Sequence, residues 1–334
     1  MLSLDDTIAA IATPLGEGGI GIVRLSGPDA AAILDRLFVP ASPSHGGRLQ
    51  PRTLHYGHVV DPATGQVVDE VLAAHLPAPA TYTRQDVVEI DGHGGIVALR
   101  RVLGLCLRHG ARLAEAGEFT ARAFLNGRLD LAQAEAVLDV VQARTEVSLA
   151  AAVDQLGGRL SNRLQPLREK LLHSLAYLEA SLDFDQDEIP EQQIGPDLED
   201  VAAELTRLLN EAERGILYRH GVRAAIVGRP NVGKSSLLNR LLRASRAIVT
   251  DIPGTTRDTL EETLNLEGIP VVLVDTAGIS AETEDPIERL GIERSRAALA
   301  AADLALLVVD ASEPLTPADR AIAALALAKP AILV

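Results

Sequence analysis

The chain has 334 residues, of which 47% are hydrophobic and 23% charged, a composition typical of a globular protein and not of a disordered one. Its formal net charge of −15 argues against a surface coated with positive charge for binding nucleic acid, although it leaves room for a local basic patch or a basic partner. The length exceeds what one compact core usually holds, so we expect two or three domains.

The single cysteine and the first residues indicate where the protein resides. Cys106 lies in an apolar run and has no second cysteine for an internal disulfide, so we expect a buried, inert thiol in a reducing compartment. Asp5 and Asp6 lie where a signal peptide needs basic residues. No uncharged apolar run approaches the ~18 residues that a membrane span requires. We therefore predict a cytoplasmic protein that does not engage a membrane.

Residues 1–120 mix short apolar runs with turns and are predicted to form an α+β domain. Ile20–Leu25 and Asp86–Ile90 have the length and composition of strands. A helix is predicted over Ile96–Leu103, directly after Gly95.

Residues 121–216 have helical periodicity and few glycines or prolines. Three helices are predicted, over Leu129–Gln155, Leu160–Leu182 and Leu198–Leu217, and an acidic break at residues 183–190 separates the second from the third. Because each helix carries an aliphatic stripe that must be buried, we expect the first part of an all-α helical bundle.

Residues 217–334 change to the strand–loop–helix order of an α/β domain. Val222–Val227 is predicted to be a strand, and Val271–Val274, Ala305–Val309 and Ala331–Val334 are apolar runs typical of parallel strands buried on both faces. Because the last run ends with the chain, we expect this domain to be incomplete and the chain to be a fragment. The predicted fold class is multidomain: an α+β domain, an all-α bundle and an incomplete α/β P-loop domain.

Residues Gly228–Ser235 read Gly-Arg-Pro-Asn-Val-Gly-Lys-Ser, which is the phosphate-binding P-loop pattern G-x-x-x-x-G-K-S. They follow a predicted strand and precede a predicted helix, Ser236–Leu242, which is the context that this loop requires. Its backbone N–H groups and the helix N-terminus would offer a positive concavity to phosphate oxygens. Lys234 would reach the β- and γ-phosphates, and Ser235 would give a hydroxyl to Mg²⁺. The alternative is a glycine-rich turn with a chance Lys-Ser pair.

Two later segments are predicted to complete a nucleotide site. Thr250–Asp258 lies where a P-loop GTPase keeps its first switch, and Thr256 is the candidate for closing over Mg²⁺ and the γ-phosphate. In the D-x-x-G segment that follows the strand Val271–Val274, Asp275 would hold a Mg²⁺-bound water and the Gly278 N–H would meet the γ-phosphate. The full set of predicted nucleotide contacts is Asn231, Val232, Gly233, Lys234, Ser235 and Ser236; Thr250, Asp251, Ile252, Pro253, Gly254, Thr255 and Thr256; and Asp275, Thr276, Ala277 and Gly278.

The residue after D-x-x-G departs from Ras-like enzymes, in which a glutamine there orients the attacking water. Here it is Ile279, which has no polar group for that role. No arginine finger is obvious, and Arg257 is a candidate that nothing else in the sequence supports. Hydrolysis is therefore predicted to be slow, unless another group supplies positive charge and positions the water.

The sequence resembles the MnmE (TrmE) family of tRNA-modification GTPases, within the TrmE/Era/EngA group of P-loop GTPases. In the last domain the resemblance rests on Gly228–Ser236, Gly254–Asp258 and Asp275–Ile279. Earlier in the chain it rests on Gly18–Ser26, on Gly92-His93-Gly94-Gly95 and on Gly117–Ala136. It covers the whole chain, and these motifs together are specific.

The resemblance implies an ion-assisted GTPase. Members bind GTP and Mg²⁺ and require K⁺, which brings positive charge where an arginine finger would. By resemblance, Ser235 and Thr256 contact Mg²⁺, Asn231 gives a side-chain oxygen to K⁺, and Glu288 orients the water, acting with Thr256 in catalysis. Glu288 lies one residue further from Asp275 than the family pattern predicts, and a solvated glutamate on a helix face is the alternative. The remaining K⁺ positions implied by the resemblance are Thr250, Ile252 and Thr255.

The resemblance also implies that the N-terminal domain dimerises and binds 5-formyl-tetrahydrofolate or another tetrahydrofolate one-carbon donor. Arg24, Glu89 and Arg128 match the folate-contacting positions, although Arg128 lies where the family often has lysine. An arginine can pair with the folate carboxylate, and a glutamate can accept from the N–H groups of the pterin. Ordinary surface charge is the alternative for Arg24 and Arg128.

The family works with a flavoprotein partner, MnmG, on C5 of the wobble uridine of certain tRNAs, giving an aminomethyl or carboxymethylaminomethyl group. One rival is an RNA-binding assembly switch of the Era/EngA kind, which has no use for a folate domain. The other is an ATPase, because the guanine-reading N-K-x-D motif is expected only after Val334. We predict that residues 1–334 alone bind guanine nucleotide poorly.

Two weaker signals are set aside. Gly16–Gly21 mimics a dinucleotide fingerprint but precedes a strand instead of following one. His93 has no partners at metal-ligand spacing, so we expect a turn histidine.

Overall fold

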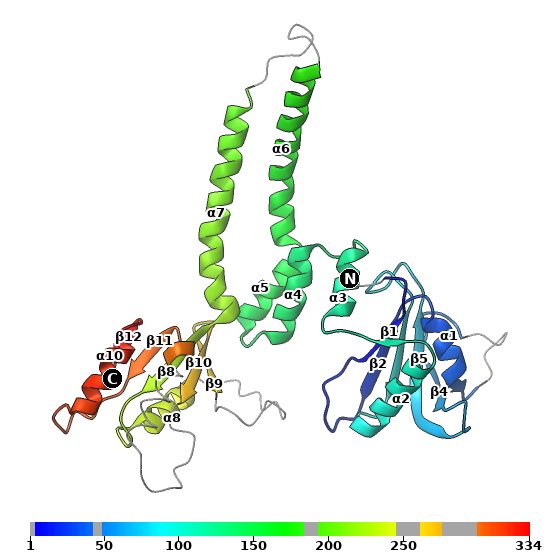
Figure 1. Cartoon of the computed structure of the whole chain (residues 1–334), viewed down its shortest axis with the longest axis horizontal. Coiled ribbons are helices and arrows are strands. Elements are labelled where there is room, and N and C mark those ends of the chain that lie inside the picture. The colour runs from blue at the N-terminus through cyan, green and yellow to red at the C-terminus, as the bar shows by residue number, and fades with distance from the viewer. Residues whose placement is uncertain (1–3, 43–48, 184–192, 245–260, 276–298) are drawn as a thin grey trace. The chain divides into compact units, whose positions relative to one another are not determined.

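The structure is a computed structural model that describes residues 4–42, 49–183, 193–244, 261–275 and 299–334. The chain forms two compact units, Met1–Glu135 and Ala136–Val334. Their elements are labelled in Figure 1. None of the helices in the described residues is long and apolar enough to cross a membrane.

A seven-stranded sheet forms the first unit, in the order β3-β4-β5-β6-β2-β1-β7. Neighbouring strands are antiparallel, except that β7 runs parallel to β1. The strands are β1 (Ile8–Ile11), β2 (Gly21–Ser26), β3 (Phe38–Pro40), β4 (His55–Val60), β5 (Val67–Leu76), β6 (Val87–Gly92) and β7 (Arg112–Leu113). The strands predicted at residues 20–25 and 86–90 are thus β2 and β6.

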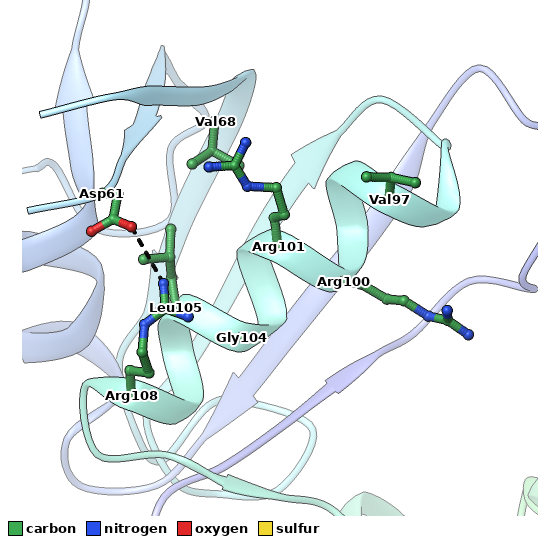
Figure 2. Close-up of a pocket in the computed structure, with 8 residues that line it drawn as sticks. All are labelled: Asp61, Val68, Val97, Arg100, Arg101, Gly104, Leu105 and Arg108. Carbon is green, nitrogen blue, oxygen red and sulfur yellow. Dashed lines mark hydrogen bonds and ion pairs between the residues drawn. The ribbon is translucent and has the colours of Figure 1, made fainter. Parts of the chain in front are cut away.

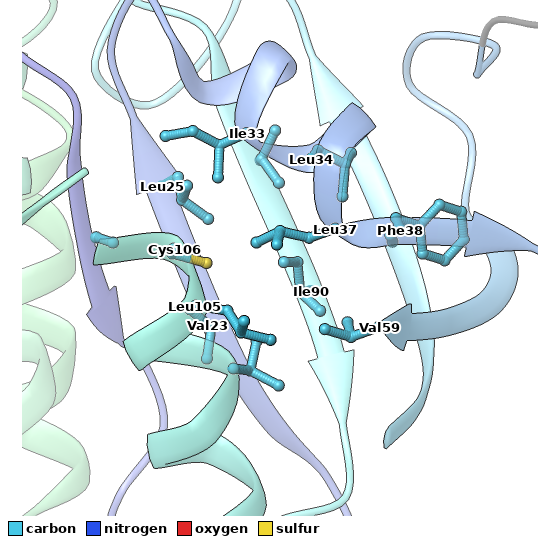
Figure 3. Close-up of a cluster of buried hydrophobic side chains, with 14 of the residues drawn as sticks. Val23, Leu25, Ile33, Leu34, Leu37, Phe38, Val59, Ile90, Leu105 and Cys106 are labelled. Atoms are coloured by element: carbon cyan, nitrogen blue, oxygen red, sulfur yellow. The ribbon is translucent and has the colours of Figure 1, made fainter. Parts of the chain in front are cut away.

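Helices α1 (Ala30–Leu37) and α2 (Ile96–Arg108) supply most of the helical side of this unit's core, and α3 (Glu118–Leu125) follows β7. Along β2, Val23 and Leu25 are fully buried, because alternate residues of a strand face the helices. Figure 3 shows their side chains among those of α1 and α2, with Cys106 in the same cluster. Burial raises the pKa of the Cys106 thiol to about 12, so the thiol is unreactive, as predicted.

Four helices follow: α4 (Leu131–Gln142), α5 (Glu146–Leu156), α6 (Arg159–Asp183) and α7 (Gly195–His220). The single helix predicted over Leu129–Gln155 is wrong, because the chain breaks between α4 and α5 at residues 143–145. Thr145 caps α5 with a reciprocal capping box to Ser148, so the helix restarts there. The other two predicted helices are present as α6 and α7, each slightly longer than predicted.

Helices α6 and α7 lie side by side and antiparallel (Figure 1). Arg163 in the first part of α6 pairs with Glu204 and Glu211 of α7, whereas Lys170 further along pairs with Asp200, nearer the start of α7. Leucines on both helices are half-exposed in the described residues: Leu171, Leu172, Leu175 and Leu178 of α6, and Leu198 and Leu205 of α7.

A five-stranded sheet, ordered β12-β11-β8-β10-β9, completes the second unit. Its strands are parallel except β9, which is antiparallel to β10. The elements are β8 (Val222–Val227), α8 (Lys234–Ala244), β9 (Glu261–Leu266), β10 (Ile269–Asp275), β11 (Leu304–Leu307), α10 (Pro317–Ala326) and β12 (Ala331–Leu333).

The central strand β8 is present as predicted, and it is buried on both faces. Ala225 and Val227 pack in one apolar cluster, while Ala224 and Ile226 pack in another on the opposite face. The prediction that residues 331–334 form a buried strand is wrong. β12 lies at the edge of the sheet, and its Leu333 side chain is 70% exposed.

Candidate functional site

The loop between β8 and α8 has the backbone geometry that its glycines allow. Gly228 has φ +156°, and a Cβ there would overlap the carbonyl oxygen of Val308, so no larger residue fits without a shift. Gly233 has φ +102°, and Asn231 has φ +64°, a left-handed conformation that asparagine tolerates better than most residues. The predicted strand–loop–helix arrangement is therefore present.

Lys234 turns back over this loop. Its Nζ donates to the carbonyl oxygens of Gly228, at 3.0 Å, and Arg229, at 2.5 Å, and the residue is only 8% exposed. An ammonium group has three donors and a full positive charge. The loop thus holds a buried cation against the backbone that is predicted to bind phosphates.

The N-terminus of α8 adds donors at the same place. Lys234 is the first residue of the helix, Ser235 and Ser236 are exposed in its first turn, and Leu237 N–H bonds back to Gly233 O at 2.9 Å. The first N–H groups of a helix lack intrahelical acceptors and carry the positive end of its dipole. The Ser235 hydroxyl is therefore accessible beside an anion-attracting helix end.

Arg229 ties the loop to a helix far along the chain, a contact that sequence reasoning missed. Its Nε donates to Asp319 Oδ1 at 2.7 Å, and its Nη2 lies 3.4 Å from Glu313 Oε2. Asp319 is 4% exposed and also accepts from the backbone N–H and hydroxyl of Thr316. The Thr316 hydroxyl bond, followed by the Thr316 N–H and Arg229, holds the pKa of Asp319 below its usual range.

The sequence did hold a partial signal for this anchor. Thr316-Pro317-Ala318-Asp319 has the Thr-x-x-acid spacing of a capping box with proline at the first helical position, and it starts α10. That pattern indicates a helix start, but it does not indicate which residue Asp319 contacts across the fold.

Asp275 ends β10 at the edge of the sheet where the P-loop begins. The parallel register places Asp275 opposite Ile226, one residue before the end of β8. The carboxyl ends of parallel strands meet at one edge, so Asp275 lies at the edge of the sheet where the P-loop begins. The other predicted contacts lie outside the described residues: Thr250, Asp251, Ile252, Pro253, Gly254, Thr255, Thr256, Thr276, Ala277, Gly278 and Glu288.

A second candidate site lies on the first unit, on the sheet face opposite the buried side chains of β2. Arg24 of β2 and Glu89 of β6 are register partners. Nε and Nη2 of Arg24 reach the same Glu89 oxygen, at 2.8 and 2.7 Å. Both side chains are about one-third exposed, so other N–H groups and the second carboxylate oxygen are accessible to a ligand.

Helix α3 brings Arg128 toward the same region. The guanidinium of Arg24 lies 6.0 Å from the Phe119 ring centroid, and that of Arg128 lies 4.7 Å from the Tyr82 ring centroid. Tyr82 in turn bonds to Thr120, the residue after Phe119, at 2.9 Å. Arg24 thus contacts Phe119 of α3, while Arg128 contacts Tyr82, which is itself bonded to the next residue of α3.

Asp91 adds an acceptor that sequence reasoning missed. It lies two residues after Glu89 on β6, so both point to the same face. Its Oδ1 is buried and has no hydrogen-bond partner among the described residues. Burial, then the nearby Glu89, raises the pKa of Asp91, and Arg24 opposes the rise. In the sequence, only the alternation of polar residues along β6 indicated that Asp91 shares a face with Glu89.

The glycine-rich motifs of the first unit pack against one another. A Cβ on Gly94 would overlap the carbonyl of Gly18, which requires a residue without a side chain at that position. His93 lies between β6 and α2, and its Nδ1 lies 2.7 Å from Asp69 Oδ1. The described residues contain no group of three or more His, Cys, Asp or Glu that could hold a metal ion.

Comparison with known proteins finds relatives along the whole chain. A family profile described as GTP-binding protein TrmE N-terminus matches residues 7–128, and one described as 50S ribosome-binding GTPase matches residues 223–334. The chain is 58% identical over 329 residues to the tRNA modification GTPase MnmE of Roseiflexus sp. (strain RS-1), which covers 98% of this chain and 70% of that protein. It is 55% identical over 331 residues to the protein of that name from Chloroflexus aurantiacus, covering 99% and 72%. Among solved structures, the G domain of the T. maritima FeoB iron transporter is 29% identical, covers 34% of this chain and 69% of that one, and has a TM-score of 0.24.

Proposed function

The chain belongs to the MnmE family of tRNA-modification GTPases, and from that premise we propose that it binds and hydrolyses GTP at the loop between β8 and α8 while it takes part in tRNA modification. The observation that carries the choice of site is the buried ammonium of Lys234, held against the carbonyls of Gly228 and Arg229 at the head of α8. The Asp275 position beside that loop supports the same placement.

Two metal ions have separate roles in this proposal. Mg²⁺ is held by the exposed Ser235 hydroxyl and by Thr256, with Asp275 acting through a water. K⁺ is held by Asn231, whose left-handed backbone and exposed side chain at the loop support the assignment, and by Thr250, Ile252 and Thr255. Glu288 orients the attacking water. Positive charge from K⁺ would then offset the lack of an arginine finger and of a glutamine at Ile279.

The face of β2 and β6 is proposed to bind a tetrahydrofolate one-carbon donor. Arg24 and Arg128 would meet its carboxylates, and Glu89 would accept from the pterin N–H groups. The orphaned Asp91 oxygen fits this ligand class, because a pterin edge presents several donors, and Tyr82 and Phe119 offer rings for its flat surface. When bound, the folate supplies the one-carbon unit of the modification.

At the level of the whole protein we propose three domains, at residues 1–120, 121–216 and 217–334, and a homodimer formed through the first. We further propose that the protein acts in the cytoplasm with the flavoprotein MnmG on C5 of the wobble uridine. The described residues of the two proposed ligand sites lie in different units, those of the folate site in Met1–Glu135 and those of the nucleotide site in Ala136–Val334.

The test of the GTPase mechanism is GTP hydrolysis by the full-length parent protein, in KCl against NaCl at equal ionic strength. We expect strong stimulation by K⁺ in the unsubstituted protein and loss of that stimulation in Asn231→Ala. Lys234→Ala should abolish hydrolysis in both salts and serves as the control for nucleotide binding. Equal, slow rates in both salts would remove K⁺ from the mechanism and favour an RNA-binding assembly switch.

The test of the folate site is binding of 5-formyl-tetrahydrofolate. Arg24→Ala and Arg128→Ala should each weaken binding, while Arg36→Ala, an exposed arginine on α1, should not. No binding by the unsubstituted protein would contradict the folate proposal and leave GTP hydrolysis untouched.

A further inference from the structure

A groove of 310 Å³ lies on the first unit between α2, the strand β5 and the turn that links β4 to β5 (Figure 2). Three aliphatic side chains, Val68, Val97 and Leu105, contribute apolar lining, and Arg100, Arg101 and Arg108 contribute charge. This volume is at the lower end of what small-ligand sites show and is sufficient for one nucleotide-sized group. Neither candidate site described above uses any of these residues.

The groove is a local concentration of positive charge on an acidic protein. α2 carries its three arginines and no acidic residue, whereas the whole chain has a net charge of −15. Arg100, Gly104 and Arg108 follow one another at four-residue spacing, so they share one face of the helix over about 12 Å. Arg100 and Arg108 are therefore attached along one face of α2, and Arg101 is the next residue after Arg100.

Two of the arginines are fixed in position by the turn that links β4 and β5. Arg108 Nη2 lies 3.4 Å from Asp61 Oδ2, and Arg101 Nη2 donates to Gln66 Oε1 at 3.1 Å. Asp61 and Gln66 are themselves joined, because Asp61 N–H bonds to Gln66 O at 2.9 Å. A guanidinium has five N–H donors, so each arginine keeps most of them for a ligand.

The third arginine has no such structural role. Arg100 makes no hydrogen bond or ion pair with any residue that the structure describes. Figure 2 shows Arg101 and Arg108 reaching from α2 toward Val68 and Asp61, while Arg100 extends away from them. Arg100 also lines the groove, but its guanidinium lies further out than those of Arg101 and Arg108 (Figure 2). A polyanion that enters the groove and continues over the helix would meet all three.

We propose that this groove binds the sugar–phosphate backbone of the tRNA, with one nucleotide over the apolar lining and successive phosphates on the three arginines. The proposal rests on the proposed function, which supplies tRNA as the substrate. Arginine pairs with phosphate through parallel N–H bonds, and each neutralised phosphate releases counterions, which makes binding depend on salt.

The experiment measures the affinity of the protein for unmodified tRNA between about 50 and 200 mM KCl, and the slope of log K against log salt. Arg100→Ala should reduce the magnitude of that slope by about one, because one phosphate contact is lost. The triple variant Arg100→Ala, Arg101→Ala, Arg108→Ala should reduce it by about three. Arg168→Ala, an exposed arginine of α6 without a partner among the described residues, is the matched control and should leave it unchanged.

A variant that adds bulk without removing charge tests whether tRNA binding requires the open groove or only the positive charge. A Cβ at Gly104 would meet only Arg108 Nη1, at 3.7 Å, so Gly104→Leu fits the helix and fills the groove. Replacing a helical glycine also raises helix propensity by about 1 kcal/mol, which protects the fold. Gly104→Leu should weaken tRNA binding with little change in salt slope. The triple variant loses the two contacts to the β4–β5 turn, so thermal melting tests whether it remains folded.

The outcomes are distinguishable. Unchanged tRNA affinity and salt slope in Arg100→Ala and Gly104→Leu, with normal binding by the unsubstituted protein, would overturn this proposal and leave the proposed function in place. Absence of tRNA binding by the unsubstituted protein would overturn both. Binding of AMP that Gly104→Leu abolishes, without any effect of these variants on tRNA, would assign the groove to a small nucleotide and overturn the proposal.

Discussion

At the scale of single residues, the position of the P-loop backbone depends on the Arg229 side chain. This role requires no contact between that side chain and the nucleotide. Arg229 is the first variable residue of the G-x-x-x-x-G-K-S pattern, and its guanidinium is bound to the buried Asp319 while its carbonyl accepts from Lys234. The arginine therefore fixes the same stretch of backbone that holds Lys234, the lysine proposed to bind phosphate. A charge-assisted hydrogen bond of this kind is worth about 1.5–3 kcal/mol.

Arg229→Ala should weaken GTP binding by roughly tenfold, the equivalent of about 1.4 kcal/mol, because the loop loses its anchor. The effect should appear in KM more than in kcat, since positioning of the loop serves ground state and transition state alike. The control is Glu313→Gln, which removes only a long contact to an exposed carboxylate and should behave like the unsubstituted protein. A kcat loss with unchanged KM would instead place Arg229 in the chemical step.

Asp91 gives a pH-dependent prediction. Its pKa is raised in the folded protein, chiefly by burial, above an unfolded value of 3.8. As pH rises from the unfolded pKa of 3.8 to the higher folded pKa, the Asp91 carboxyl loses its proton first in the unfolded chain. Asp91 therefore progressively lowers the free energy of unfolding. Asp91→Asn should therefore be more stable than the unsubstituted protein near pH 7 and no more stable below about pH 3.8.

Thermal or urea unfolding of the Asp91→Asn protein at both pH values would test this. Glu115→Gln, at an exposed position, is the control and should leave the unfolding transition unchanged at both pH values. If Asp91→Asn lost stability at neutral pH, the carboxylate would have a stabilising partner, and the orphaned oxygen could not be offered as a ligand acceptor.

At the scale of elements, the start of α5 joins the helical segment to the five-stranded sheet. Thr145 Oγ1 donates to Gly268 O, in the turn between β9 and β10, at 2.9 Å and accepts from Ser148 N–H at 3.0 Å. Gly268 has φ +94°, and a Cβ there would lie 2.7 Å from Val147 Cγ2. The first turn of α5 thus packs closely on that turn.

Thr145→Ala should lower the free energy of unfolding by about 1–2 kcal/mol, since it removes an N-cap and leaves the Gly268 carbonyl without this donor. Thr145→Ser should retain most of the stability because the hydroxyl remains. Thr206→Ala is a suitable control, because its hydroxyl bonds only to the carbonyl four residues earlier on an exposed helix face. Equal losses in Thr145→Ala and Thr206→Ala would contradict the proposed role of this contact.

The same contact explains why sequence reasoning merged α4 and α5. No glycine or proline interrupts residues 131–156, so local propensity alone favours one helix. The break is fixed by partners more than a hundred residues away, and such partners cannot be read from periodicity. The prediction that β12 is buried was wrong for a different reason. An apolar run indicates a strand but does not reveal whether that strand lies inside the sheet or at its edge.

The candidate nucleotide site was more predictable, because its chemistry is local. Gly228, Gly233 and Lys234 fall within one loop, and a strand before it and a helix after it suffice to identify it. The Arg229–Asp319 pair was missed because its members lie 90 residues apart. Arg24 and Glu89 were named separately, and their pairing emerges only from the register of β2 and β6.

At the scale of the whole molecule, the first unit contains everything that its fold and its proposed folate site require. Its apolar core is drawn from residues between Ala9 and Ala111. Beyond that core, buried Arg122 binds Glu118 on its own helix and Asp6 near the N-terminus, and Arg112 binds the same two acids. The segment after β6 is therefore closed onto the start of the chain by charge as well as by packing.

A chain of residues 1–130, which ends before α4, should fold alone, unfold in one cooperative transition and bind 5-formyl-tetrahydrofolate. A chain of residues 1–110 keeps nearly all of the core but loses Arg112, Glu118 and Arg122, so it should melt at a lower temperature and, without Arg128, bind folate weakly. Within the longer chain, Arg122→Met should cost about 3–5 kcal/mol, because Glu118 would stay buried without one of its partners. Circular dichroism melts and titration with the folate would follow both properties. A residue 1–130 chain that lacked a cooperative transition would show that the first unit depends on the rest of the protein, and the proposed N-terminal folate domain would lose its independence.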